Sequence, residues 1–116
     1  MIRLISKTPN GKIFKCSECN AFHIEFKNLN FNFDRTQFRF FTESIQNING
    51  EEWEVQNKDS NYTRKILIPT GQKGLNILFN SVELQELRNL LTGKVYIPQV
   101  VNKVINVDFS DISFHN

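Results

Sequence analysis

A short pattern that occurs twice constrains this chain more than any other feature. Residues 28–38 and 74–84 align without a gap, and the similarity continues into the residues that follow each of them. Self-similarity at a fixed spacing indicates that one supersecondary unit is used twice. The clearest matches pair Leu29 with Leu75, Asn30 with Asn76, Phe33 with Phe79, Asp34 with Asn80, Phe41 with Leu87 and Ile45 with Leu91.

Each copy of the pattern predicts a strand that runs directly into a capped helix. From residue 28 to 33 asparagines alternate with apolar side chains, which is the period of a strand with one buried face. Asp34 then offers an oxygen to the first helical turn, and Gln37 can reach back to complete a capping box. Asn80 and Glu83 have the same spacing in the second copy.

The two helices are predicted over about residues 35–48 and 81–92. Asn49-Gly50 is predicted to end the first helix, and Gly93 the second. Their inward stripes are spaced as on the buried face of a helix. These stripes comprise Phe38, Phe41, Ile45 and Ile48 in the first helix, and Leu84, Leu87, Leu90 and Leu91 in the second.

Further strand patterns lie ahead of each copy. Residues 12–16 and 21–27 flank the two cysteines, with Phe22, Ile24 and Phe26 alternating in the second of these strands. In the second copy, residues 52–56 and 62–69 are predicted as strands around the polar turn 57–61. The predicted unit is therefore β-β-β-α.

These elements predict an α+β fold, with an antiparallel sheet and two helices built from two β-β-β-α repeats. The chain has 116 residues, enough for a single domain over 1–116. Its repeat units would cover about 11–50 and 51–93, followed by a C-terminal extension over 94–116. In that extension, the valines from Val100 onward would suit a helix, whereas the alternation from Ile105 to Phe109 favours a strand.

Composition and charge exclude several classes. No stretch approaches a membrane span or an export signal, so we expect a cytoplasmic protein with no membrane partner. Its cysteines should then be reduced thiols or metal ligands. No phosphate loop, nucleophile elbow or metalloprotease motif is present, which favours a protein that is not an enzyme.

The order of a C-x-x-C hairpin, a strand and helix over 29–45, the run 64–70 and a leucine-rich helix over 83–91 resembles a family of small uncharacterised proteins from Bacteroidota. The resemblance covers roughly residues 11 to 92. It implies no activity, and no functional residue is transferred from it.

Cys16 and Cys19 are the candidate metal ligands. A redox pair is disfavoured, because a strand and not a helix follows Cys19. Zinc needs four ligands, which leaves three alternatives: an intrachain site with His23 and either His115 or a carboxylate, a four-thiolate site shared by a dimer, or a turn with free thiols. The cofactor is thus none or zinc. The turn 57–61, taken as the counterpart of the cysteine turn, has no cysteine, which argues against a need for metal.

Phe40 is the candidate partner contact. On a helical wheel it falls on the polar side of the first helix, with Glu43 and Asn47, and its counterpart in the second copy is Glu86. Either it lies under the C-terminal extension, against Ile112 or Phe114, or it contacts a partner.

The sequence therefore predicts a non-catalytic interaction module. It would bind a protein partner or a second copy of itself through the C-x-x-C hairpin and the outer face of the first helix. The alternative is a nucleic-acid-associated, zinc-ribbon-like protein, in which a basic N-terminal segment contacts phosphates. The residues of that segment are Arg3, Lys7, Lys12 and Lys15.

Overall fold

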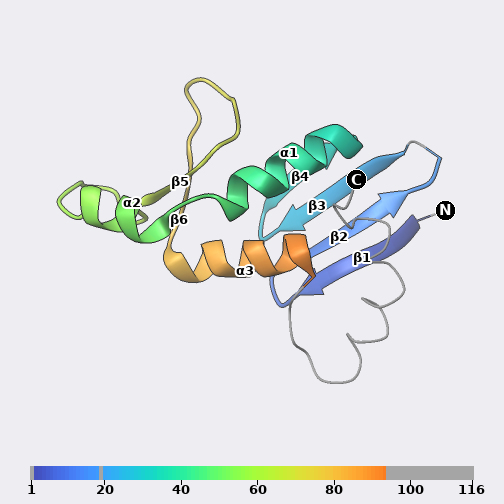
Figure 1. Ribbon diagram of the computed structural model, residues 1–116, viewed down its shortest axis with the longest axis horizontal. Coiled ribbons are helices and arrows are strands. Elements are labelled where there is room, and N and C mark those ends of the chain that lie inside the picture. Colours follow the sequence, from blue (N-terminus) through green and yellow to red (C-terminus); the bar gives the residue numbers. More distant parts are fainter. Residues whose placement is uncertain (1, 19, 94–116) are drawn as a thin grey trace.

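The computed structural model describes residues 2–18 and 20–93, and the predictions for Cys19 and for residues 94–116 lie outside them. It has an α+β fold, as predicted (Figure 1). The elements in chain order are β1 (Ile2–Thr8), β2 (Gly11–Cys16), β3 (Ala21–Phe26), β4 (Leu29–Phe33), α1 (Arg35–Gln46), α2 (Gly50–Gln56), β5 (Ile66–Ile68), β6 (Ile77–Phe79) and α3 (Ser81–Thr92).

The first four strands form one antiparallel sheet in which spatial order follows chain order. β5 and β6 form a separate antiparallel pair. Figure 1 shows α1 and α3 side by side along the sheet, with the β5–β6 pair and α2 beyond one end of it. Since α3 contacts β1 and β2 while α1 contacts β3 and β4, the two helices together cover one face of the sheet.

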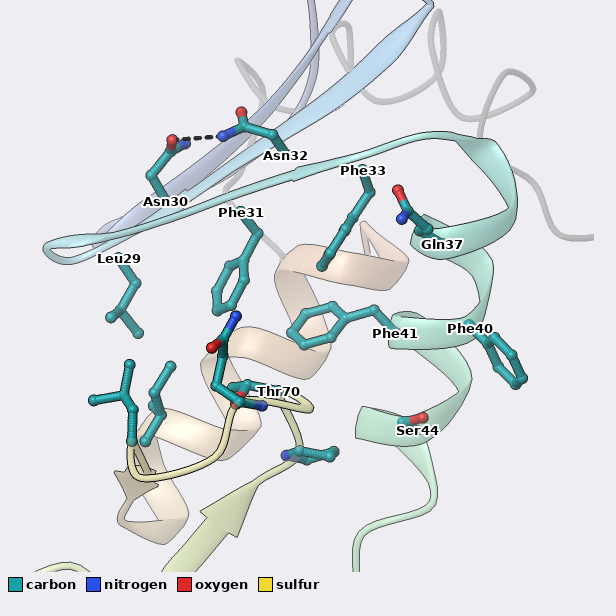
Figure 2. Close-up of a pocket in the computed structure, with 14 residues that line it drawn as sticks. Leu29, Asn30, Phe31, Asn32, Phe33, Gln37, Phe40, Phe41, Ser44 and Thr70 are labelled. Carbon is teal, nitrogen blue, oxygen red and sulfur yellow. Dashed lines mark hydrogen bonds between the residues drawn. The ribbon is translucent and has the colours of Figure 1, made fainter.

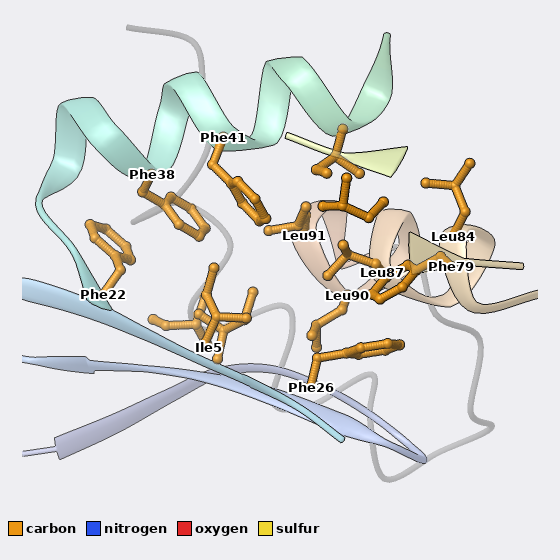
Figure 3. Close-up of a cluster of buried hydrophobic side chains, with 14 of the residues drawn as sticks. Ile5, Phe22, Phe26, Phe38, Phe41, Phe79, Leu84, Leu87, Leu90 and Leu91 are labelled. Atoms are coloured by element: carbon orange, nitrogen blue, oxygen red, sulfur yellow. The ribbon is translucent and has the colours of Figure 1, made fainter. Parts of the chain in front are cut away.

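The core lies between this sheet face and the two helices (Figure 3). The rings of Phe22 and Phe38 stack with centroids 4.5 Å apart and an angle of 5° between them, which joins β3 to α1. Phe26 meets Phe79 at 5.4 Å, which joins the sheet to the β5–β6 pair. The buried hydrophobic residues of the described part of the chain are Ile5, Ile13, Phe22, Ile24, Phe26, Phe38, Phe41, Ile45, Ile66, Ile68, Phe79, Leu84, Leu87, Leu90 and Leu91.

Helix α3 approaches the start of β2 closely, and Gly11 permits it. A Cβ atom on Gly11 would lie 2.8 Å from Leu90 Cδ2 and 2.9 Å from the carbonyl oxygen of Glu25. Both distances are shorter than a Cβ atom adopts, so the Leu90 side chain would have to shift, and the Glu25 oxygen is backbone with little freedom to move. The glycine therefore sets how deeply α3 packs onto the sheet.

Both predicted capping boxes are present. The Asp34 side chain accepts a hydrogen bond from the Gln37 N–H at 2.8 Å, and the Gln37 side chain accepts one from the Asp34 N–H at 2.9 Å. Asn80 and Glu83 exchange the same pair of bonds at the start of α3. Gly93 caps the other end of α3 with a φ of 68°, so the predicted range 81–92 is confirmed.

Replacing Asp34 with alanine is expected to lower the free energy of unfolding by about 1 kcal/mol, because the first turn of α1 loses its side-chain acceptor. Urea denaturation of the full chain measures this loss. Thr36→Ala is the control, since Thr36 is exposed and takes no part in the capping box. Equal losses in both variants would show that the cap does not stabilise α1.

The prediction of a strand over 52–56 is wrong, because these residues belong to helix α2. The Asn49 side chain accepts a hydrogen bond from the Glu52 N–H at 3.1 Å, and the acidic pair Glu51 and Glu52 occupies the first turn. Both features stabilise a helix N-terminus. Asn49-Gly50 therefore begins a second helix instead of ending the first, which stops at Gln46.

The second unit consequently differs from the predicted β-β-β-α order. Its elements are α2, β5, β6 and α3, and the strand predicted over 62–69 is limited to Ile66–Ile68. Residues 57–61 connect a helix to a strand, so they are not the counterpart of the cysteine turn, and the comparison drawn from them fails. The two units correspond only from the strand before the cap to the end of the helix.

None of the helices within residues 2–18 and 20–93 is both long and apolar enough to cross a membrane.

Candidate functional site

Strand β4 lies at an edge of the sheet. The N–H of Lys27 donates to the carbonyl oxygen of Asn10 at 2.7 Å, which extends the hydrogen-bond ladder between β2 and β3. Because hydrogen-bonded pairs alternate along an antiparallel ladder, the odd-numbered residues of β3 direct their backbone N–H and C=O groups toward β2. The even-numbered residues of β3 therefore direct their backbone groups toward β4. Their partners in register are Leu29 with Phe26, Phe31 with Ile24 and Phe33 with Phe22.

The backbone groups of Asn30 and Asn32 therefore point away from β3, toward the open edge. Among the turn, loop and cap hydrogen bonds of the described residues, none involves the backbone of Asn30 or Asn32. An edge of this kind is a template on which a further strand can add.

A groove of about 570 Å³ runs along this edge (Figure 2). Strand β4 and helix α1 form two of its sides, and the connection from β5 to β6 forms the third. We call it the β4 groove. Its lining comprises Leu29, Asn30, Phe31, Asn32, Phe33, Gln37, Phe40, Phe41, Ser44, Pro69, Thr70, Gln72, Leu75 and Ile77.

Three aromatic rings form the inner wall of the β4 groove. The Phe41 ring lies 4.9 Å from that of Phe31 and 5.2 Å from that of Phe33, measured between centroids. Figure 2 shows all three rings directed into the space between β4 and α1. Phe31 and Phe33 are only half-buried, so the wall offers aromatic surface that the described residues leave open.

Large apolar side chains also mark the rim. Phe40 on α1 is 70% exposed and Leu75 in the β5–β6 connection is 58% exposed. None of the lining residues that the structure describes carries a charge. The β4 groove thus combines apolar walls with backbone donors and acceptors from Asn30 and Asn32, which suits an extended, uncharged stretch of polypeptide.

On the opposite face of the sheet, a chain of hydrogen bonds orders the side chains next to the edge. Asn30 Nδ2 donates to the Ile24 carbonyl at 3.3 Å, and Asn32 Nδ2 donates to Asn30 Oδ1 at 2.9 Å. Asn32 Oδ1 is then the acceptor for His23 Nδ1 at 2.6 Å. This network assigns the Nδ1–H tautomer to His23, whose ring stacks on Phe14 at 5.0 Å.

Of the predicted metal ligands, only Cys16 and His23 fall within the described residues. Cys16 is half-buried at the end of β2, in register with Ala21, and His23 is on the same sheet face. In the described ranges, no three residues among His, Cys, Asp and Glu come together as a metal site. Cys19 and His115 lie outside those ranges, so the zinc prediction stays a prediction.

The sheet separates the four basic residues predicted to contact phosphates. Arg3 and Lys15 are in register on the face toward the helices, where Lys15 Nζ lies 5.4 Å from the centre of the Phe22 ring. Lys7 and Lys12 are in register on the opposite face. Lys12 Nζ lies 3.7 Å from Glu25 Oε1. The four cations therefore do not form one surface.

The residues predicted as a partner surface on α1 are all exposed, namely Phe40, Glu43 and Asn47. Only Phe40 reaches the β4 groove. The aromatic residues of β4 and the connection from Pro69 to Ile77 are the parts of the site that sequence reasoning missed. The alternation in β4 was recognised, but its apolar side was assigned wholly to the core.

A buried carboxylate ties the β5–β6 region to the sheet. Glu83, 6% exposed, accepts two hydrogen bonds from Arg64, at 2.7 and 2.9 Å, and one from Lys27 at 2.8 Å. The bonds from Arg64 lower the pKa of Glu83 to about 2, against the opposing effect of burial, with further contributions from Lys27 and the Asn80 N–H. Glu83 is therefore ionised across the physiological range.

A second carboxylate, Glu86, holds the β1–β2 turn. It accepts bonds from Thr8 Oγ1 at 2.6 Å, from the Asn10 N–H at 2.8 Å and from Asn10 Nδ2 at 2.9 Å. Burial opposes ionisation, but the hydrogen bonds from Thr8 and Asn10 outweigh it and hold the pKa of Glu86 below its usual value. Both carboxylates bind side chains or backbone groups of the protein itself, so their role is to stabilise the fold.

A family model, described as a family of unknown function (DUF6686), matches residues 1–115 and so extends beyond the range 11–92 of the resemblance drawn from sequence motifs. No curated protein matches the chain, and no solved structure matches it.

Proposed function

The chain belongs to DUF6686, a family of unknown function, and we propose that this member is a non-catalytic interaction module that receives one extended polypeptide segment in the β4 groove. The segment would add to β4 as a strand. We also propose that the family comes from Bacteroidota, that it has a C-x-x-C hairpin, and that the protein is cytoplasmic.

The open edge beside an aromatic wall is the observation that carries the proposal. Asn30 and Asn32 direct N–H and C=O groups outward. Phe31, Phe33 and Phe41 lie beside them. Strand addition uses both features at once, since main-chain bonds supply affinity and apolar pockets select alternate side chains. The proposal differs from the sequence-based one in placing the contact at β4 instead of the C-x-x-C hairpin.

Selection from a phage-displayed library of random linear peptides tests this proposal. We expect peptides in which apolar and polar residues alternate to be enriched on the full-length protein. Phe40→Ala and Leu75→Asp should each weaken binding of a selected peptide about tenfold, because each removes apolar surface from the rim. Isothermal titration of the synthetic peptide measures the loss.

Val55→Asp is the matched control. Val55 is 65% exposed on α2 and takes no part in the lining of the β4 groove, so this variant should bind the peptide as the unmodified protein does. Two results would refute the proposal: enrichment of no alternating peptide, or equal binding by the Phe40, Leu75 and Val55 variants.

A further inference from the structure

We propose that the segment received in the β4 groove is strand β4 of a second copy of this chain, so that two four-stranded sheets join edge to edge across a two-fold axis. The inference rests on the proposed function, because it names the polypeptide that occupies the groove. The axis passes through Phe31 and runs perpendicular to the sheet.

The spacing of the outward backbone groups fits this axis. Asn30 and Asn32 both direct N–H and C=O groups away from β3, and Phe31 lies between them. An axis through Phe31 pairs each asparagine with the other asparagine of the second copy, as the hydrogen-bonded pairs of an antiparallel ladder. An axis through either asparagine would set the other one opposite a residue beyond the ends of β4.

The side chains of β4 are complementary to their own copies. Two-fold symmetry would bring like charges together if the strand were charged, and like charges opposite each other destabilise a sheet. None of the five residues from Leu29 to Phe33 is charged, and their alternation of apolar and polar reads the same in both directions. A strand that pairs with itself needs this symmetry, whereas a strand that receives an unrelated segment does not.

Strand β1, at the other edge of the sheet, is protected against such pairing. Its register shifts between Leu4 and Ser6, and it carries the exposed cations Arg3 and Lys7. Bulges and charged side chains are common means by which edge strands avoid pairing with further strands. The register of β4 with β3 is continuous from Leu29 to Phe33. Since only the β4 edge accepts a strand, association ends at two copies.

The aromatic wall supplies apolar area that two short strands lack. Stable interfaces bury roughly 800 Å² on each partner, which a pair of short strands does not provide alone. Because the axis is perpendicular to the sheet, both copies turn their apolar side chains to the same face. Phe31 then meets Phe31 of the second copy in a non-hydrogen-bonded pair, where side chains approach most closely. The half-buried Phe33 (Figure 2) and the exposed Leu75 extend this apolar surface.

Sedimentation equilibrium of the full-length protein at a series of concentrations tests the inference, and we expect a reversible dimer. The double variant Asn30→Lys with Asn32→Lys sets lysines opposite each other across the axis. Its dimer dissociation constant should therefore rise on the order of tenfold or more. Asn30→Glu with Asn32→Glu should have the same effect. An equimolar mixture of the two double variants should recover the dimer, because lysines then face glutamates, and this recovery also shows that both variants fold.

Lys7→Glu is the control, since it changes the charge of an exposed residue at the β1 edge and should leave the dissociation constant unchanged. An unmodified protein that is a monomer at every concentration would overturn the inference. So would a mixture of the double variants that dimerises no better than either one alone, or an equal loss in the Lys7 variant.

The peptide selected to test the proposed function separates the two proposals. If this peptide binds and dissociates the dimer, both stand, because peptide and second copy compete for one edge. If the peptide binds a protein that is a monomer at every concentration, the inference fails alone. If the dimer forms and responds to charge as expected but no alternating peptide is selected, the groove accepts no separate polypeptide, so the proposed function fails and the inference stands.

Discussion

Replacing Glu83 with glutamine is expected to lower the free energy of unfolding by roughly 2 to 3 kcal/mol at neutral pH. The variant loses the two charge-assisted bonds from Arg64 and the one from Lys27, and leaves both cations without their shared carboxylate. The loss is smaller than for a fully buried pair, because the Arg64 and Lys27 side chains are 45% and 41% exposed.

The same substitution should flatten the acid side of the stability profile. The pKa of Glu83 is lowered from 4.5 to about 2 in the folded protein. Its contribution to stability is therefore fully present above pH 4.5 and is lost as the pH falls from 4.5 to about 2, since the unfolded chain takes up the proton first. Urea denaturation at a series of pH values through this window measures the contribution.

Glu86→Gln is the matched control on the same helix. Glu86 accepts bonds from Thr8 and Asn10, both neutral, so its replacement should cost less at neutral pH and flatten the profile less. The account of Glu83 fails if the two variants lose equal stability and keep equal slopes between pH 4.5 and about 2.

The second large effect is expected for Phe38→Ala. Phe38 is 1% exposed and stacks on Phe22 at the centre of the contact between α1 and β3. Truncation removes this contact and leaves a cavity that close-packed neighbours fill only in part, so the free energy of unfolding should fall by about 3 to 5 kcal/mol.

Phe40→Ala, two residues along the same helix, is the control for Phe38. Its ring is 70% exposed, so its truncation should change the free energy of unfolding by less than about 0.5 kcal/mol. The midpoint and slope of urea denaturation separate the two variants. A loss for Phe40 as large as that for Phe38 would contradict this account.

Local sequence signals were sufficient to predict helices α1 and α3 but not helix α2. Asp34 and Asn80 each precede a segment whose apolar residues have helical spacing. The capping residue and the spacing both predict a helix, so its type and its first residue follow from the sequence. Over residues 52–56 tryptophan and valine alternate with polar residues, which is a strand period, while Asn49 and the acidic first turn favour a helix. The segment forms a helix, as its cap favours, and none of the α2 residues is buried.

Strand β1 was not among the predicted strands because a register shift disrupts its alternation. Leu4 pairs with Phe14 and Ser6 pairs with Ile13, so the intervening Ile5 is an extra residue and both Ile5 and Ser6 are buried. Such a bulge removes the two-residue period on which strand prediction depends.

The β4 groove could not be predicted, because no single segment contains it. Its lining comes from β4, from α1 and from the connection between β5 and β6, which meet only in the folded chain. Sequence identified Phe40 as an unusual aromatic on a polar helix face. It could not show that the apolar side of β4 is only partly covered by the helices.

The hydrogen bonds that join α3 to the four-stranded sheet bear on the order in which the protein folds. The four-stranded sheet closes through hairpins between neighbouring strands, whereas Glu86 bonds to residues 76 and 78 positions away and Glu83 to one 56 positions away. Distant contacts require the closure of long loops and are slow to form. We therefore expect the hairpins to pair early and α3 to dock late, so that the two carboxylates govern chiefly how fast the protein unfolds.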